Sequence, residues 1–327
     1  MRTKTIASVV GVLAILGLAA MGAPTDVNAG QKKFITIASA RPGGSWYISG
    51  AGWAEMLNKY ISGIEAKVEQ SGGGVQNNKL VSDGDTELGI SVGRLSTLAM
   101  QGKGAFARSG KLPNIRLLVN RFSIGVMQFA ALERSGITTV CDLKGKRVAL
   151  GPEGGGGIPA AMAAFEACGF TIKDVTVSYM SYEQGKDDLV DGNLDAFLSY
   201  AAVPVPALKA LEATPVAKWR LLPLPEEKAA QIEKDIPGYI RYVVPAAAYG
   251  RPADIVTIGA PNILIVNKDL DEKLAYEITK VTVGRLEEFR KIEPTHREMT
   301  KENAAKPFPG LSFHPGAIRY YKEAGLM

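Results

Sequence analysis

Two stretches of the chain decide the fold: residues 34–45 read FITIASARPGGS, and residues 147–158 read RVALGPEGGGGI. Each begins with a short run of apolar and β-branched residues, which predicts a strand. Each then passes through a glycine-rich turn into a helical pattern, where Trp53, Leu57 and Tyr60 mark one apolar helix face after the first turn. We therefore predict two strand–turn–helix units.

The order of elements in the first unit returns later in the chain. At a constant offset of about 108 positions, Gly84 is matched by Gly192 and Ser91 by Ser199. Strands that alternate with helices are typical of parallel sheets. The sequence therefore predicts an α/β fold with two similar lobes, each built on a parallel-core sheet.

The two lobes are expected to be joined by two strands that form a hinge. Residues 114–132 and 255–266 are strand-like and border the second half of the repeat. We predict lobe I at residues 30–124 plus 262–327 and lobe II at residues 125–261, with the ligand cleft between them.

The N-terminus predicts export. Arg2 and Lys4 precede the apolar run 9–20 (VVGVLAILGLAA), and small or polar residues follow up to Ala29. This is the pattern of a cleavable secretory signal peptide, here residues 1–29, and it places the mature protein in the periplasm. The alternative is an uncleaved membrane anchor at residues 6–23, a length at the lower limit for a spanning helix.

Composition excludes several classes of protein. With 46% hydrophobic and 22% charged residues the chain is an ordinary globular protein. Two His and two Cys are too few for a zinc or iron–sulfur site, so no metal or cofactor is expected. The net charge is only +5, and Lys and Arg form no block with aromatics, which argues against a nucleic-acid partner. Cys141 and Cys168 leave two alternatives open, a disulfide and two buried thiols.

The glycine-rich turns predict the binding site. In open parallel sheets ligands bind beyond the carboxyl ends of the strands, where the turns lie. Glycine allows the backbone to approach a ligand closely, and a helix N-terminus offers free N–H groups to an anion. Arg41 and Arg94 lie at the same end of the strands. For each of them the sequence leaves two roles, pairing with an anion and a solvated position at the surface. The turns show no Walker A ending and no complete dinucleotide pattern.

Several motifs, taken together, are similar to those of the TAXI family, the solute receptors of one group of tripartite ATP-independent periplasmic (TRAP) transporters. The matching stretches span nearly the whole mature chain and are GGSWY (43–47), GGGVQN (72–77), DLKGKRVALG (142–151), GNLDAF (192–197), Val-Pro (203–204), the surroundings of Tyr249, and HPGAIRYYKEAG (314–325).

The resemblance implies a two-lobed, type II-like periplasmic binding protein. Such a protein closes on a small organic anion, for example a glutamate-like carboxylate, and delivers it to a TRAP membrane permease. Departures from the family pattern are Glu153 followed by four glycines, Trp46 and Arg94. Together with the glycine-rich turns, the resemblance predicts these ligand-binding residues: Arg41, Gly44, Ser45, Trp46, Tyr47, Gly73, Asn77, Arg94, Glu153, Gly154, Gly155, Gly156, Ser199 and Tyr200.

Competing functions are weaker on sequence grounds. An enzyme would need a nucleophile–base pair or a metal site, and neither the Gly-x-Ser-x-Gly nor the HExxH pattern occurs. A ligand-sensing regulator would add a DNA-binding or signalling segment. The nearest alternative is the solute-binding protein of an ATP-driven importer, which differs only in its membrane partner.

Overall fold

Two long strands, β4 (Ile115–Leu132) and β10 (Ile255–Asn267), run antiparallel through both halves of the sheet. The computed structural model describes residues 32–42, 44–214 and 218–327, and the predicted signal peptide lies outside them. The strands predicted at 114–132 and 255–266 are confirmed. The division of the chain into two lobes stays a prediction.

Within these ranges the strands belong to one ten-stranded sheet in the order β2-β1-β3-β10-β4-β7-β5-β6, with β8 paired to β4 and β9 to β10. The two predicted parallel-core sheets are thus parts of one continuous sheet, because the two predicted joining strands, β4 and β10, stay hydrogen-bonded where they cross between the halves. Their register shifts between Asn262 and Leu264, and Arg121 opposite has a φ of 48°. Such an irregularity bends and twists a strand pair locally without separating it.

The first half of the sheet contains three parallel strands, β1 (Lys33–Ala38), β2 (Ile64–Glu69) and β3 (Leu88–Val92). A helix follows each of them, and the chain returns to this half after β10. The helices of this half are α1 (Ser45–Tyr60), α2 (Gly74–Asp83), α3 (Gly93–Gln101), α8 (Glu272–Gly284), α9 (Leu286–Ile292), α10 (Lys301–Ala305), α11 (Pro315–Glu323), and the short 3-10 turns η1 (Gly104–Phe106) and η6 (Pro294–Glu298).

The second half repeats the same plan, as the sequence predicts. Its parallel strands are β5 (Arg147–Ala149), β6 (Thr176–Ser178) and β7 (Ala196–Ala201). The other elements are η2 (Glu133–Ser135), η3 (Val140–Leu143), α4 (Gly157–Ala167), η4 (Ile172–Asp174), α5 (Tyr182–Val190), α6 (Pro206–Glu212), β8 (Trp219–Leu222), α7 (Glu226–Asp235), β9 (Ile240–Val244) and η5 (Ala246–Ala248).

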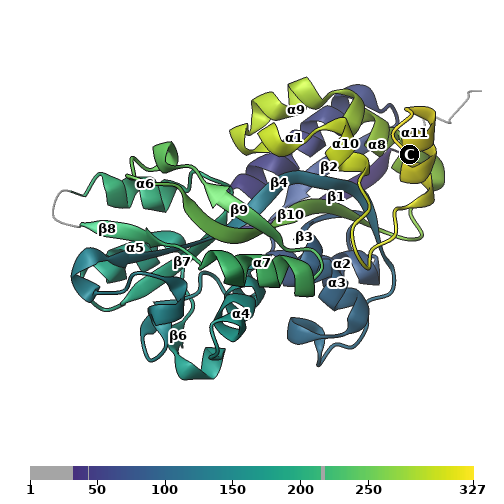
Figure 1. Ribbon diagram of the computed structural model, residues 1–327. Coiled ribbons are helices and arrows are strands. Elements are labelled where there is room, and N and C mark those ends of the chain that lie inside the picture. The colour runs from purple at the N-terminus through teal and green to yellow at the C-terminus, as the bar shows by residue number, and fades with distance from the viewer. Residues whose placement is uncertain (1–31, 43, 215–217) are drawn as a thin grey trace, which may run out of the picture. The chain divides into compact units, whose positions relative to one another are not determined.

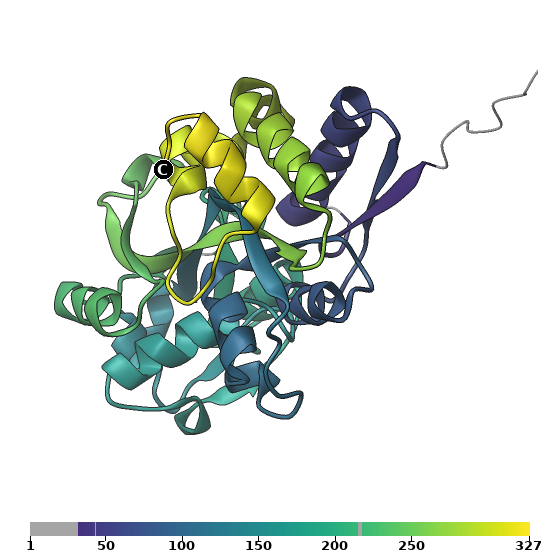
Figure 2. The same cartoon turned by 90° about the vertical axis from the view of Figure 1, so that its right-hand side faces the viewer.

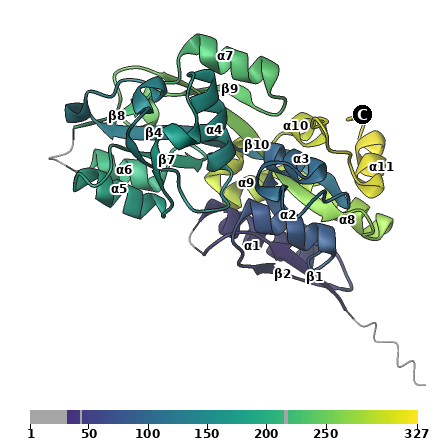
Figure 3. The ribbon, with the colours of Figure 1, turned by 90° about the horizontal axis from the view of Figure 1, so that it is seen from below.

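The crossing strands separate the helices of the two halves. Figure 1 shows α1, α8, α9, α10 and α11 at one end of the sheet and α5 and α6 at the other. In Figure 2 the C-terminal helix α11 lies beside α8. Seen from below in Figure 3, α1 and α2 lie on one side of β10 and α4 and α5 on the other.

The core continues from one half to the other along β4. In the first half Trp53 of α1 packs edge-on against Phe122 of β4 at 4.9 Å and against Phe289 of α9 at 4.6 Å, between ring centroids. In the second half Phe129 of β4 packs against Phe165 of α4 at 5.9 Å. A strand that is buried on both faces, as β4 is, needs a nearly unbroken run of apolar residues, which its sequence supplies.

The two cysteines form a disulfide, which settles the alternative that the sequence leaves open. Cys141 lies in η3 and Cys168 caps the end of α4, with 5.2 Å between their Cα atoms. The bond holds the C-terminal end of α4, whose other end carries the second glycine-rich turn. Disulfides of this kind persist in oxidising compartments.

Candidate functional site

The second glycine-rich turn, residues 151–157, lies against the loop at residues 72–75 and against the end of β3 in the first half. A Cβ atom placed on Gly154 would lie 3.6 Å from the carbonyl oxygen of Gly72 and 3.8 Å from Cβ of Val75. A Cβ atom on Gly156 would lie 2.6 Å from Cγ2 of Val92, at the end of β3. The first glycine-rich turn, residues 41–45, is not part of these contacts, so its predicted meeting with the second turn stays a prediction.

Trp46 joins this contact from the first helix. Gly74, the first residue of α2, is so close to the indole that a Cβ atom there would lie 3.7 Å from its Cη2. The same atom would lie 2.7 Å from Leu95 of α3. The first turns of α1, α2 and α3 therefore pack directly on one another, next to the second half.

Tyr200 occupies the centre of the contact. Its ring lies over three glycines, since a Cβ atom would come within 2.5 Å of it at Gly125, 3.5 Å at Gly156 and 3.4 Å at Gly157. Gly125 lies on β4 where that strand passes between the halves, and the other two glycines begin α4. A larger residue at Gly125 would displace the ring.

The Tyr200 hydroxyl is buried; the Ala260 backbone amide approaches its oxygen, but within the described residues its proton has no acceptor. Burial raises the pKa of this hydroxyl well above its usual range, so it stays protonated and able to donate. A buried donor without an acceptor costs free energy, and such groups are found where a ligand or water completes the bond.

Four helices begin at this site, and all four leave their N-termini open. The helices α1, α2, α3 and α4, as the structure describes them, have no side-chain cap hydrogen bond and no acidic residue in the first turn. Three of their N-cap residues are the glycines Gly44, Gly73 and Gly156. Away from the site Ser181 caps α5 and Asp271 caps α8, whereas α6 also begins without a side-chain cap.

Free N–H groups and an unopposed helix dipole favour a negative charge. An acidic side chain in the first turn would satisfy part of that preference and compete with a bound anion. Four open helix N-termini that contact one another through their turns therefore form an electropositive site made largely of backbone.

Arg94 adds a full positive charge to the same place. It lies in the first turn of α3, the end of a helix where a cation is unfavourable. The salt bridges of the described residues do not include it. A cation placed against the dipole needs an anion nearby to balance both.

Tyr239, which the sequence analysis missed, faces Arg94 from the second half. Burial raises the pKa of the Tyr239 hydroxyl, while the positive charge of Arg94 acts in the opposite direction. Tyr239 also influences the pKa of Tyr200. The tripeptide Pro237-Gly238-Tyr239 is a turn signal in the sequence, but nothing local indicates that it meets α3.

The other predicted residues have different exposures. Arg41, Gly44 and Glu153 are exposed at the rim, Ser45, Trp46, Tyr47, Gly73, Gly154, Gly155 and Gly156 are half-buried, and Asn77 and Ser199 are fully buried.

Two of the predicted contacts face inward. The Asn77 amide donates to the carbonyl oxygens of Ser39 at 2.6 Å and Ile90 at 2.7 Å, which ties the ends of β1 and β3 together. In this arrangement Asn77 positions the turns and is not open to a solute. Ser199 lies beneath Tyr200 on β7, and its Oγ has no partner among the described residues. Ligand contact by any of these residues stays a prediction.

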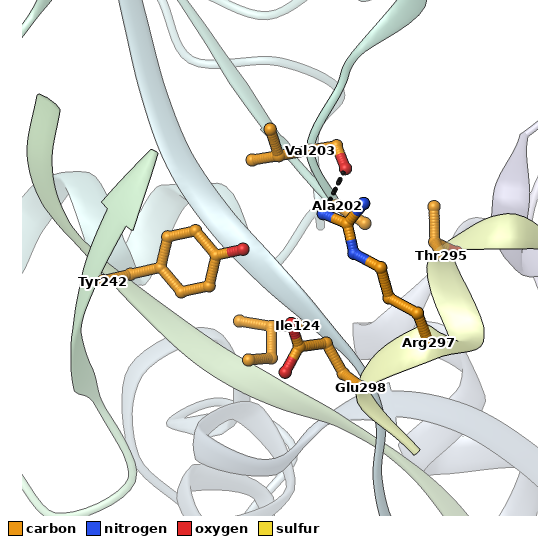
Figure 4. Close-up of a pocket in the computed structure, with 7 residues that line it drawn as sticks. All are labelled: Ile124, Ala202, Val203, Tyr242, Thr295, Arg297 and Glu298. Carbon is orange, nitrogen blue, oxygen red and sulfur yellow. Dashed lines mark hydrogen bonds between the residues drawn. The ribbon is translucent and has the colours of Figure 1, made fainter. Parts of the chain in front are cut away.

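A small cavity lies on the other side of the crossing strands. Its volume is about 10 Å³, room for about one water molecule. As Figure 4 shows, Arg297 of η6 crosses it and donates to the carbonyl oxygen of Val203 at 3.1 Å, with Tyr242 and Glu298 alongside. This bond links a segment of the first half to the loop after β7.

Two searches bear on other kinds of site. In residues 32–42, 44–214 and 218–327, no three His, Cys, Asp or Glu side chains are grouped so that they could hold a metal ion. In the same ranges, none of the helices combines the length and apolar character that crossing a bilayer requires.

The fold is that of the periplasmic binding proteins, an α/β sheet whose halves share two crossing strands. PhnD1 from Prochlorococcus marinus MIT 9301, solved in complex with methylphosphonate, is similar at 12% identity and a TM-score of 0.56, over 90% of this chain and 99% of that one. XAC2383 from Xanthomonas citri, bound to ATP, is similar at 11% identity and a TM-score of 0.53, over 90% and 97%. The periplasmic aliphatic sulphonate binding protein SsuA from Escherichia coli matches at 15% identity and a TM-score of 0.45, over 80% and 78%.

The chain belongs to the NMT1-like family, whose model matches residues 37–325. This match does not confirm the resemblance to TAXI receptors, which stays a prediction.

Proposed function

We propose that the protein is a periplasmic solute-binding protein that captures a small organic anion between the two halves of its sheet and delivers it to a membrane importer. The observation that carries the proposal is the convergence of four uncapped helix N-termini, free of acidic residues, around Tyr200 and Arg94. The proposed role is binding without chemical change.

The available donors are sufficient for useful affinity. A hydrogen bond to a charged group contributes about 1.5–3 kcal/mol, and a micromolar Kd corresponds to about 8 kcal/mol. The Arg94 guanidinium and a few backbone amides therefore supply enough, together with apolar contact on Trp46. A guanidinium can bind a carboxylate or phosphonate through two parallel hydrogen bonds.

Capture requires the two halves to separate. A Cβ atom on Gly154 would already be in van der Waals contact with the Gly72 carbonyl oxygen, at 3.6 Å, so the two loops leave little room between them for a solute. We take lobe I as residues 30–124 plus 262–327 and lobe II as residues 125–261, moving about β4 and β10. A solute that contacts both lobes binds the closed state better and shifts the population toward it.

The solute class follows from the charges at the site. Its one acidic side chain among the predicted residues is Glu153, which is exposed at the rim. A zwitterionic amino acid needs an acceptor for its ammonium group, whereas a pure oxoanion needs only donors. We therefore favour carboxylic, phosphonic and sulfonic acids. PhnD1, which shares the fold, holds methylphosphonate.

The sequence leaves two kinds of importer as the membrane partner, a TRAP permease and an ATP-driven importer. The expectation of a TRAP permease rested on the TAXI resemblance, and the family that matches is the NMT1-like one. We therefore favour the alternative, an ATP-driven importer. Uptake into membrane vesicles supplied with the purified protein would then require ATP and persist when an ionophore collapses the ion gradients; loss of uptake with the ionophore would favour a TRAP permease.

The binding proposal is tested by thermal denaturation of the exported chain with methylphosphonate, an alkanesulfonate, succinate, glutamate, and the neutral methyl esters of the acids. A bound solute raises the Tm with concentration. We expect a dose-dependent rise with at least one acid and none with its ester. Equal shifts with acid and ester, or no shift with any acid at millimolar concentration, would overturn the proposal.

A further inference from the structure

The segment between α10 and α11 is fastened to the first half of the sheet. Carbonyl oxygens along it accept from Asn120 at 2.7 Å (at Lys306), from Thr97 at 2.8 Å (at Pro309) and from the Leu117 amide at 2.9 Å (at Ser312). Asn120 and Leu117 lie on β4 before the crossing, and Thr97 lies on α3. The segment therefore moves with the first half.

One side chain of this segment reaches the second half. Phe308 is only 5% exposed, and its ring lies between two glycines from opposite halves. A Cβ atom on Gly93, at the start of α3, would overlap the ring. A Cβ atom on Gly238, between α7 and β9, would lie 2.7 Å from its Cζ. Only glycine fits at either position while the ring is in place.

The next residue after each glycine belongs to the candidate site. Arg94 follows Gly93, and Tyr239 follows Gly238, and both glycines pack on the Phe308 ring. The ring of Phe308 therefore lies beside the backbone that carries the cation of the first half and the phenol of the second half.

We propose that Phe308 is a positioning residue of the solute site. Its aromatic ring acts as a wedge that docks into the second half only when the halves close. The ring thereby sets both the closure equilibrium and the alignment of Arg94 with Tyr239. The inference rests on the proposed function, because it assumes that the halves open and close about β4 and β10. Opening withdraws Gly238 from the ring and exposes apolar surface to water, which favours the closed arrangement.

The structure supplies a matched control. Phe313 lies in the same segment and is 8% exposed, but its ring packs on Tyr321 of α11 at 5.2 Å between centroids, and it pairs with Leu117. These partners belong to the first half. Phe313→Ala removes as many atoms as Phe308→Ala without touching the contact between the halves.

The test uses spin labels on the ligand-free protein. Glu55→Cys on α1 and Gln231→Cys on α7 place labels at exposed positions of the two halves, and the described residues contain no free cysteine to compete. Phe308→Ala should raise the population at the longer inter-label distance several-fold, whereas Phe313→Ala should leave the distance distribution as in the parent. An unchanged distribution in Phe308→Ala overturns the proposal.

A second variant distinguishes loss of the Phe308 contact from a general disturbance of the fold. Gly93→Ala should give the same shift as Phe308→Ala, because its Cβ displaces the ring, and the double variant should open no further than Phe308→Ala alone. Additive opening would show that the ring is not the contact and would overturn the proposal. Because no solute is used, a failed solute screen leaves this result interpretable.

Discussion

Gly156 and Val92 touch across the two halves of the sheet: a Cβ atom on Gly156, the N-cap of α4, would lie 2.6 Å from Cγ2 of Val92, the N-cap of α3. Two uncapped helices therefore begin at opposite sides of one van der Waals contact. Opening of the halves, as we propose it, would break this contact, which makes it a place to test closure.

Gly156→Ala should weaken the closed state. The φ of Gly156 is −67°, so alanine is compatible with the backbone and only the contact with Val92 resists it. We expect the radius of gyration of the ligand-free protein to increase in small-angle scattering. Val92→Ala in the same chain should restore compaction.

Gly284→Ala is the control, because a Cβ atom there would meet only the Tyr320 hydroxyl, at 3.6 Å. An unchanged radius of gyration in Gly156→Ala would show that this contact does not control closure.

Arg94→Gln should change stability and affinity in opposite directions. Removing a cation from the first turn of α3 relieves an unfavourable charge–dipole interaction of about 0.3–1 kcal/mol, so the ligand-free protein should unfold at a slightly higher temperature. Affinity for the acid found in the screen should fall by about 1–3 kcal/mol, since a charge-assisted bond is lost. Calorimetry that shows unchanged affinity would remove Arg94 from the site.

The free energy of unfolding should depend on pH through the protonation of His296, which is buried in the first half. Its Nε2 lies 2.7 Å from Ser49 Oγ, its Nδ1 lies 3.1 Å from the Phe289 carbonyl oxygen, and burial lowers its pKa from 6.5 to about 4. Between these pH values the unfolded chain binds a proton that the folded chain does not. Stability from this group is therefore complete above pH 6.5 and is lost as the pH falls toward 4, by about 3 kcal/mol.

Urea unfolding measured between pH 7 and pH 4 checks this expectation. His296→Gln should flatten the dependence over that range, since the amide keeps hydrogen-bonding capacity without titrating. Burial also lowers the pKa of His314, so His314→Gln serves as the comparison and should leave the His296 contribution intact. An equally steep dependence in His296→Gln would assign the effect to other groups.

Sequence reasoning predicts the parts of this molecule that repeat locally. Strand, glycine-rich turn and helix follow one another in residues 34–60 and again in 147–167, and glycine at a helix start is visible without a structure. The crossing strands are visible because 114–132 has no turn signal. That each glycine-rich turn lies at the carboxyl end of its strand follows from the order strand, turn and helix in the sequence.

What the sequence does not predict depends on contacts between distant segments. Whether β4 and β10 keep one sheet continuous is decided by backbone register, not by composition. Tyr239 and Phe308 lie in loops without periodicity, so only tertiary packing brings them beside α3. Asn77 has the residue type of a ligand contact, yet its amide is used by the carbonyls of Ser39 and Ile90.

Tyr200→Phe separates a structural role of this ring from a binding role. The ring fills the space that Gly125, Gly156 and Gly157 leave open, and phenylalanine fills it equally well. The hydroxyl proton has no acceptor among the described residues, so removal of the hydroxyl relieves the desolvation of an unpaired buried donor, about 1–3 kcal/mol. We expect the ligand-free variant to be more stable than the parent in urea.

If a bound acid accepts from this hydroxyl, the same variant should bind it about ten-fold more weakly, about 1.4 kcal/mol. Tyr182→Phe is the control, because that hydroxyl already donates to the Tyr200 carbonyl oxygen at 2.9 Å and its loss should lower stability. A Tyr200→Phe protein that gains stability and keeps full affinity would show that the ring only fills space, and the solute would then have to be sought closer to Arg94.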